Sequence, residues 1–192
     1  KYLIVNETAG TDGNALYVKN LRTNSEFMQL TVGYDYSYTL VGSRGDSLYM
    51  LTNYKAPRGK LICIDMNRTD VGEWIDIIEE QKDVLTDVTM AKSNFVAVHM
   101  VDAVSRMEVY TLDGKKERDI EQPVMGTVGS MSGRAGTDEL FYSFSSFTVP
   151  SVVYRLVPST GEQKEVFRPE LDFAFDDYVV EQVFYPSVNS QM

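Results

Sequence analysis

The chain has 192 residues, of which 43% are hydrophobic and 11% are aromatic, enough to form a real core. Its net charge of −10, with no basic patch, argues against nucleic acid as a partner. No apolar run approaches the length needed to cross a membrane, so we expect no membrane partner. The lone cysteine, Cys63, excludes an internal disulfide and leaves open whether the compartment is cytoplasmic or periplasmic.

Short apolar runs recur at a period of roughly 45 residues, which is typical of β-propeller blades. The first run of each unit lies at Tyr2–Asn6, Leu48–Asn53, Phe95–Val101 and Leu140–Phe144. The second lies at Leu16–Val18, Leu61–Asp65, Met107–Tyr110 and Val152–Tyr154. These runs lack the three- and four-residue spacing of helices. They predict an all-β fold, a partial β-propeller of about four blades over residues 1–170.

We expect the blades at about 1–33, 34–81, 82–123 and 124–170. Innermost strands are predicted at Tyr34–Val41, Val84–Ala91 and Gly126–Ser132, and the first unit has no such candidate. Because a natural domain rarely begins inside a blade, we interpret the chain as an excised piece of a longer protein. In the second unit, Val71–Glu80 has some helical character, but the repeat favours an outer strand at Trp74–Ile78.

The fourth unit contains the most strongly patterned stretch of the chain. Leu140, Tyr142 and Phe144 alternate, and Phe141 fills the opposite face, which predicts a strand buried on both sides. Beyond Pro169 the repeat stops. We expect residues 171–192 to be a connector, with one further strand at Tyr178–Ser187.

No catalytic, cofactor or metal site is predicted from the residues. Gly129-Ser130-Met131-Ser132-Gly133 superficially resembles a nucleophile elbow, but Met131 stands where the serine is required. The sole histidine, His99, alternates within a strand and is expected to be structural. The acidic group Asp172, Asp176 and Asp177 does not have the spacing of an EF-hand loop.

Several stretches together resemble the propeller domain of prolyl oligopeptidase, a serine peptidase that cuts short peptides after proline. They are Tyr34–Tyr36, Lys82–Leu85, Lys92–Phe95, Glu139–Phe147, Asp177–Tyr178 and Gln182–Ser187. The resemblance implies the second half of a seven-bladed propeller, with residues 171–192 leading towards an α/β-hydrolase catalytic domain. The family's catalytic serine, aspartate and histidine would then lie beyond Met192. Here Val188–Met192 departs from the Lys-Asp-Gly-Thr continuation that is usual in the family.

The resemblance also implies partners and one substrate-facing residue. Lys19 falls where mammalian members carry a cysteine near the substrate, although an ordinary solvent-facing lysine is an equal alternative. Partners would be the missing catalytic domain, the first half of the propeller and short peptides. Bare end faces of the blade stack predict a homo-oligomer. The alternative function is a propeller-type interaction module with no peptidase attached.

Overall fold

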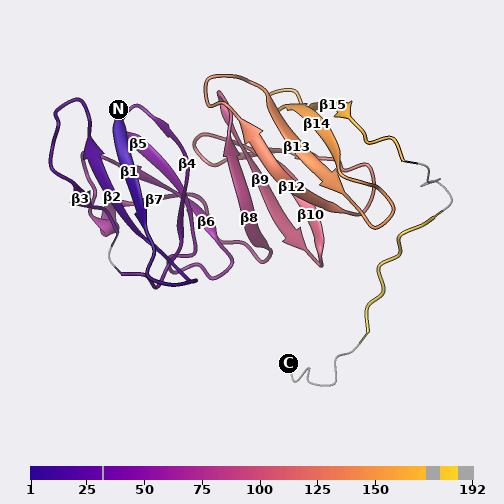
Figure 1. Cartoon of the computed structure of the whole chain (residues 1–192), viewed down its shortest axis with the longest axis horizontal. Helices are drawn as coiled ribbons and strands as arrows, with labels where there is room; N and C mark the ends of the chain where they lie inside the picture. The colour runs from indigo at the N-terminus through magenta and orange to yellow at the C-terminus, as the bar shows by residue number, and fades with distance from the viewer. Residues whose placement is uncertain (32, 172–177, 186–192) are drawn as a thin grey trace.

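The computed structural model describes residues 1–31, 33–171 and 178–185. These residues form four antiparallel sheets, and every strand pairs only with its neighbours in sequence. Figure 1 shows the sheets following one another in chain order, from β1 at the N-terminus to β15. This sequence of meanders is a partial β-propeller of four blades and confirms the fold class predicted from the repeat.

The first sheet has three strands, β1 (Tyr2–Glu7), β2 (Ala15–Asn20) and β3 (Met28–Gln29). The second has β4 (Tyr38–Arg44), β5 (Ser47–Thr52), β6 (Lys60–Asp65) and β7 (Ile75–Ile78). The third has β8 (Val84–Met90), β9 (Asn94–Val101), β10 (Val104–Thr111) and β11 (Lys116–Ile120). The fourth has β12 (Thr127–Gly133), β13 (Leu140–Ser145), β14 (Val152–Val157) and β15 (Glu162–Phe167). A 3-10 turn, η1 (Val71–Glu73), precedes β7.

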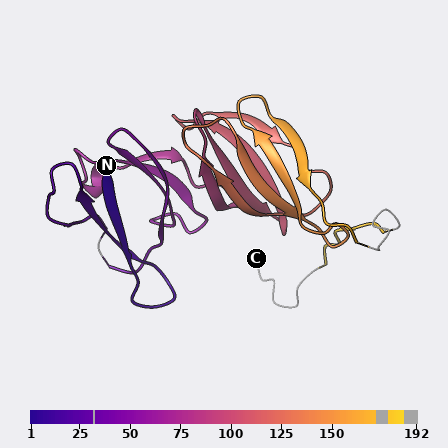
Figure 2. The ribbon, with the colours of Figure 1, turned by 45° about the horizontal axis from the view of Figure 1, so that its top comes forward.

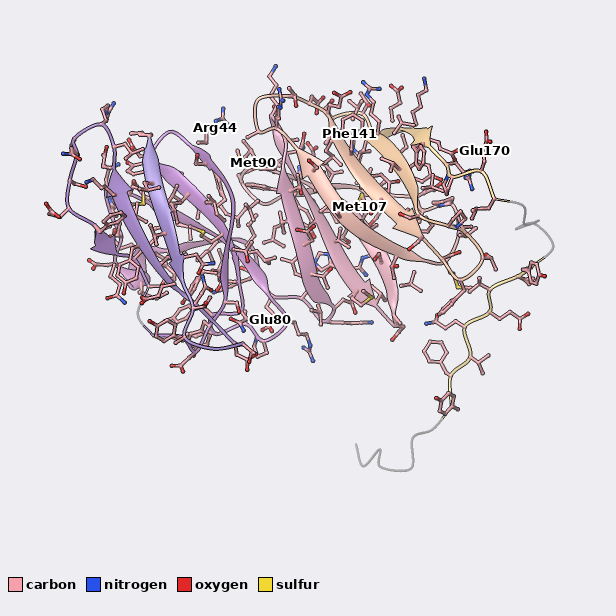
Figure 3. The ribbon with its side chains drawn as sticks, in the orientation of Figure 1. Arg44, Glu80, Met90, Met107, Phe141 and Glu170 are labelled. Atoms are coloured by element: carbon pink, nitrogen blue, oxygen red, sulfur yellow. The ribbon has the colours of Figure 1, made fainter. Side chains whose placement is uncertain are left out.

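A hydrophobic core fills each of the three spaces between successive sheets. Leu16 and Val18 of the first sheet pack with Met50 and Ile62 of the second. Met90 belongs to the core between the second and third sheets, and Met107 to that between the third and fourth (Figure 3). Propeller blades are stabilised by this burial of apolar side chains between sheet faces.

The two middle sheets are buried on both faces, which explains their nearly continuous apolar strands. On β5, Met50 faces the first sheet while its neighbour Tyr49 faces the third. Cys63 lies in the same core as Tyr49 and is 9% exposed, as expected for a small apolar residue. Strand alternation therefore distributes core residues to two neighbouring blades rather than to core and solvent.

The fourth sheet corrects the prediction of a strand buried on both sides. Leu140, Tyr142 and Phe144 are at most 1% exposed, whereas Phe141 is 41% exposed. Their alternation is that of a strand with one covered face, because no described sheet packs on the Phe141 side. Figure 2 gives a second view of this terminal sheet.

Two further expectations are wrong in part. The first predicted innermost strand starts at Tyr38 rather than Tyr34, because Asn14 N–H donates to the Tyr36 carbonyl at 2.9 Å and ties that segment to the first sheet. The strand expected at Tyr178–Ser187 is absent from residues 178–185, and its last two residues lie outside the described part. Most of the predicted connector, including Asp172, Asp176 and Asp177, also lies outside it. The predicted outer strand is confirmed as β7.

Turn glycines fit one blade closely against the next. Gly114 has φ +89°, and a Cβ there would lie 1.9 Å from the Ile77 carbonyl oxygen on the preceding blade. Gly13 has φ +73° and would clash similarly with the Tyr34 carbonyl. Both positions need glycine for the left-handed backbone and for the close approach.

Among the described residues, no helix is long and apolar enough to span a bilayer.

Candidate functional site

The innermost strands of the three complete blades share a β-bulge at a similar position. The register shifts between Leu40 and Gly42 on β4, between Leu85 and Asp87 on β8, and between Val128 and Met131 on β12. Bulges re-aim side chains and are common beside functional sites. Here they repeat along the inner rim of the blades, the part of a propeller that borders its central channel.

Asp87 is the carboxylate that this bulged rim partly buries, and the sequence analysis did not single it out. Burial raises the pKa of Asp87, while a hydrogen bond from the Val88 backbone N–H opposes that rise. No ion pair joins it to any described residue. Asp87 is therefore a half-buried carboxylate on the innermost strand of the third blade.

The serines of Gly129–Gly133 lack the surroundings of a nucleophile. Both lie on β12 rather than at a strand–helix turn. Ser130 N–H donates to the Ser143 hydroxyl at 3.0 Å, and the two hydroxyl oxygens are 3.4 Å apart. In the described part of the chain, no imidazole or carboxylate contacts the Ser130 hydroxyl to activate it.

His99 is confirmed as a buried strand residue, 1% exposed, and its partner is a buried acid. Its Nδ1 atom lies 3.2 Å from Oε2 of Glu108, at an angle outside that of a good hydrogen bond. Glu108 is itself 2% exposed. The pair is closed to solvent and therefore has no access to a substrate.

Glu108 is the centre of a charge network that the sequence analysis did not predict. Its carboxylate accepts hydrogen bonds from the Tyr110 hydroxyl and the Lys116 ammonium, each at 2.6 Å. The Arg106 Nε atom lies 3.0 Å from Oε1, and the same guanidinium donates to Asp83 at 3.0 Å. Asp83 immediately precedes β8, so the network ties three neighbouring segments of the third blade together.

Two opposing effects set the pKa of Glu108: burial of its carboxylate and hydrogen bonds from its neighbours. Burial alone would raise the pKa of Glu108, but contacts with His99, Lys116 and Tyr110 outweigh it and hold that pKa well below its ordinary value of 4.5. Burial and the neighbouring carboxylate raise the pKa of Tyr110 to about 12. The arrangement keeps a charge fixed in a dry site, which is a structural role.

Lys19, the predicted substrate-facing residue, lies on β2 opposite Leu3. It is half-buried, and its ammonium lies 5.7 Å from the centroid of the Phe27 ring. Leu16 and Val18 on the same strand face the second sheet, so Lys19 is on the opposite face of the first. A contact between Lys19 and a peptide stays a prediction.

Comparison with known proteins identifies the fold. A model of the prolyl oligopeptidase N-terminal β-propeller domain matches residues 1–168. The chain is 31% identical over 189 residues to a prolyl endopeptidase of Elizabethkingia miricola and 30% identical over 187 residues to that of Elizabethkingia meningoseptica. These alignments cover 98% and 97% of the chain but only 27% and 26% of the two relatives.

Solved structures of prolyl endopeptidases and prolyl oligopeptidases also match this fold. A structure from a study of two prolyl endopeptidases superposes with a TM-score of 0.88 and 30% identity, covering 96% of this chain and 27% of that one. Prolyl oligopeptidase B from Galerina marginata, bound to a 35mer hydrolysis and macrocyclization substrate, superposes with a TM-score of 0.86 and 25% identity. That match covers 98% of this chain and 28% of the other. The chain therefore belongs to the prolyl oligopeptidase family and carries its N-terminal β-propeller region.

Proposed function

We propose that this chain is the non-catalytic propeller part of a longer serine endopeptidase that cleaves short peptides after proline. The observation that carries the proposal is the family match over residues 1–168, together with the small share of each relative that the chain spans. The triad of serine, aspartate and histidine would be supplied by a separate catalytic domain.

Within this chain, the local chemistry agrees with a non-catalytic role. His99, the sole imidazole of the sequence, is enclosed with Glu108 and is remote from solvent. The Ser130 hydroxyl contacts the Ser143 hydroxyl and, among the residues that the structure describes, no base. An activated nucleophile needs a base within hydrogen-bond reach and a third group that orients that base.

In the intact enzyme, we propose that the propeller caps the active site and restricts access to it. Blades whose faces are buried against each other form a rigid wall, so a substrate must pass through a narrow opening or between domains. A flexible peptide can do so at the cost of its own chain entropy, whereas a folded protein would first have to unfold. The selection is therefore for short peptides and against folded proteins.

The test presents the same cleavable sequence to the full-length parent protein in two forms, as a free peptide and as part of a folded domain. A free octapeptide that contains the Gly-Pro sequence should be cleaved, and the same octapeptide displayed in a surface loop of a folded domain should stay intact. Equal cleavage of the two would contradict the capping role while leaving the peptidase assignment in place. A parent that cleaves neither would favour the alternative, an interaction module without a peptidase.

A further inference from the structure

A hollow of about 570 Å³ lies at the loop end of the third and fourth blades. Its walls are the β9–β10 turn at Asp102–Val104, the connector at Met125–Thr127, the β13–β14 loop at Ser145–Phe147 and the segment 180–183. Segment 178–185 lies near the ends of these two blades (Figure 1). Pockets that bind small ligands have volumes of roughly 300–1,000 Å³.

One hydrogen bond fixes the wall that segment 180–183 contributes. The Gln182 side-chain amide donates to the Asp102 carbonyl oxygen. Asp102 and Ala103 have φ +47° and +66°, so this carbonyl belongs to a tight left-handed hairpin turn. A second hollow of about 310 Å³ shares Asp102, Val104, Met125 and Gln182 with the first, so Gln182 lines both.

The residues that line the hollow are mostly apolar, and two of them are acidic residues without an ion-pair partner among the described residues. Val104, Met125 and Phe147 supply apolar surface, and Asp102 and Glu181 supply two exposed carboxylates. Neither carboxylate forms an ion pair with a described residue. Arg106, in the wall of the second hollow, is already held by Asp83 and Glu108. Charge complementarity therefore favours an occupant that carries a positive charge.

Phe147 gives the hollow an anchor. Its side chain is 99% exposed, although the loop that carries it is well ordered by hydrogen bonds. Ser146 N–H donates to the Val149 carbonyl at 3.0 Å, and the Ser146 hydroxyl accepts from Thr148 and Val149 N–H groups at 3.2 and 3.0 Å. An exposed aromatic ring on a fixed loop pays little entropy when it is covered by a ligand.

We propose that this hollow binds the amino-terminal end of a short apolar peptide. The free α-ammonium lies between the carboxylates of Asp102 and Glu181, and the first apolar side chains cover Met125 and Phe147. The site goes beyond the proposed function, since it is built from this chain alone and requires no catalytic domain. It would hold peptides at the propeller before or after they reach an active site elsewhere.

The test measures binding of Leu-Pro-Phe-amide to the ¹⁵N-labelled 192-residue chain by NMR, up to about 2 mM peptide. Shifts should concentrate in 102–104, 125–127 and 145–147. Acetylating the peptide's amine should weaken binding by about threefold to fivefold, the size expected for exposed charge pairs. Added salt should weaken only the unacetylated peptide.

Matched variants distinguish peptide binding in the hollow from non-specific hydrophobic binding. Asp102→Asn keeps a residue that tolerates the left-handed turn, and with Glu181→Gln it should abolish the preference for the free amine. Phe147→Ser should weaken both peptides. Phe141→Ser alters an exposed ring away from the hollow, and Glu170→Gln alters an exposed carboxylate away from it. Neither should change the affinity for either peptide.

Three results would overturn the proposal. One is the absence of shifts at the highest peptide concentration. Another is equal binding of the acetylated and free peptides. The third is binding that follows Phe141 rather than Phe147. Each can occur whether or not the parent protein proves to be a peptidase.

Discussion

At the scale of single residues, Glu108 is a buried carboxylate at the centre of a charge network in the third blade. Its neighbours in the sequence make it one acidic residue in an alternating strand. In the fold it is 2% exposed and contacts Arg106, Tyr110 and Lys116. Lys116 belongs to the next strand, so the network depends on cross-strand pairing that no local pattern reveals.

Glu108→Gln should destabilise the chain by about 2–4 kcal/mol, because it leaves partly buried cations without their counter-ion. Urea unfolding followed by tryptophan fluorescence measures the change. Asp76→Asn is the matched control, since its carboxylate is 41% exposed and pairs with Lys60 at the surface. That control should cost less than about 1 kcal/mol. Equal costs for the two variants would show that the network contributes nothing.

The same network predicts the direction of the pH dependence. The pKa of Glu108 is lowered in the folded chain, so its stabilisation is complete above the ordinary value of 4.5 and is lost as pH falls towards the folded value. The difference in unfolding free energy between the wild type and Glu108→Gln should therefore shrink between about pH 5 and about pH 3. A difference that stays constant over this range would contradict an ionised Glu108 in the fold.

At the scale of elements, the repeat is sufficient to predict most strands, because each blade has the same pattern of apolar residues that pack between neighbouring sheets. Exposure was harder to predict. The sequence of β13 contains aromatic residues on both faces, yet burial depends on whether another sheet lies beyond it, and Phe141 is exposed for that reason. Residues 178–185 have an apolar pattern suited to a strand but form none, because no described strand pairs with them.

Hairpin glycines give an element-scale prediction. Gly45 and Gly114 both have positive φ, but a Cβ at Gly45 meets open space, whereas one at Gly114 meets the Ile77 carbonyl of the preceding blade. Gly45→Ala should cost about 1 kcal/mol for backbone strain. Gly114→Ala should cost about 2–4 kcal/mol, since the blades must also separate. Urea midpoints measure both, and similar values would show that this contact does not fix the blade spacing.

At the scale of the whole molecule, the two end faces of the blade stack carry exposed apolar side chains. Leu3 and Val5 are 42% and 39% exposed on the first sheet, and Phe141 and Phe167 are 41% and 59% exposed on the fourth. The fourth face is less apolar than expected from sequence, because Phe144 and Val152 are fully buried. Such faces favour pairing with further sheets.

We therefore predict that the isolated chain forms a homo-oligomer through these end faces. Light scattering after size exclusion at micromolar concentration should give at least the mass of a dimer. Replacing Leu3 and Phe141 together by lysine should restore the monomer, because burying either charge is unfavourable. Phe147→Lys, on a loop away from both faces, is the control and should leave the mass unchanged. A wild-type monomer would disprove the prediction.

The family assignment and the proposed non-catalytic role together are tested most directly by hydrolysis of a Gly-Pro fluorogenic peptide. The assay compares the 192-residue chain with its full-length parent at equal concentration. The parent should turn the peptide over, and the chain alone should be inactive, because its described residues assemble no activated nucleophile. Turnover by the chain that survives repurification and is lost in Ser130→Ala or Ser132→Ala, or an inert parent, would contradict the account.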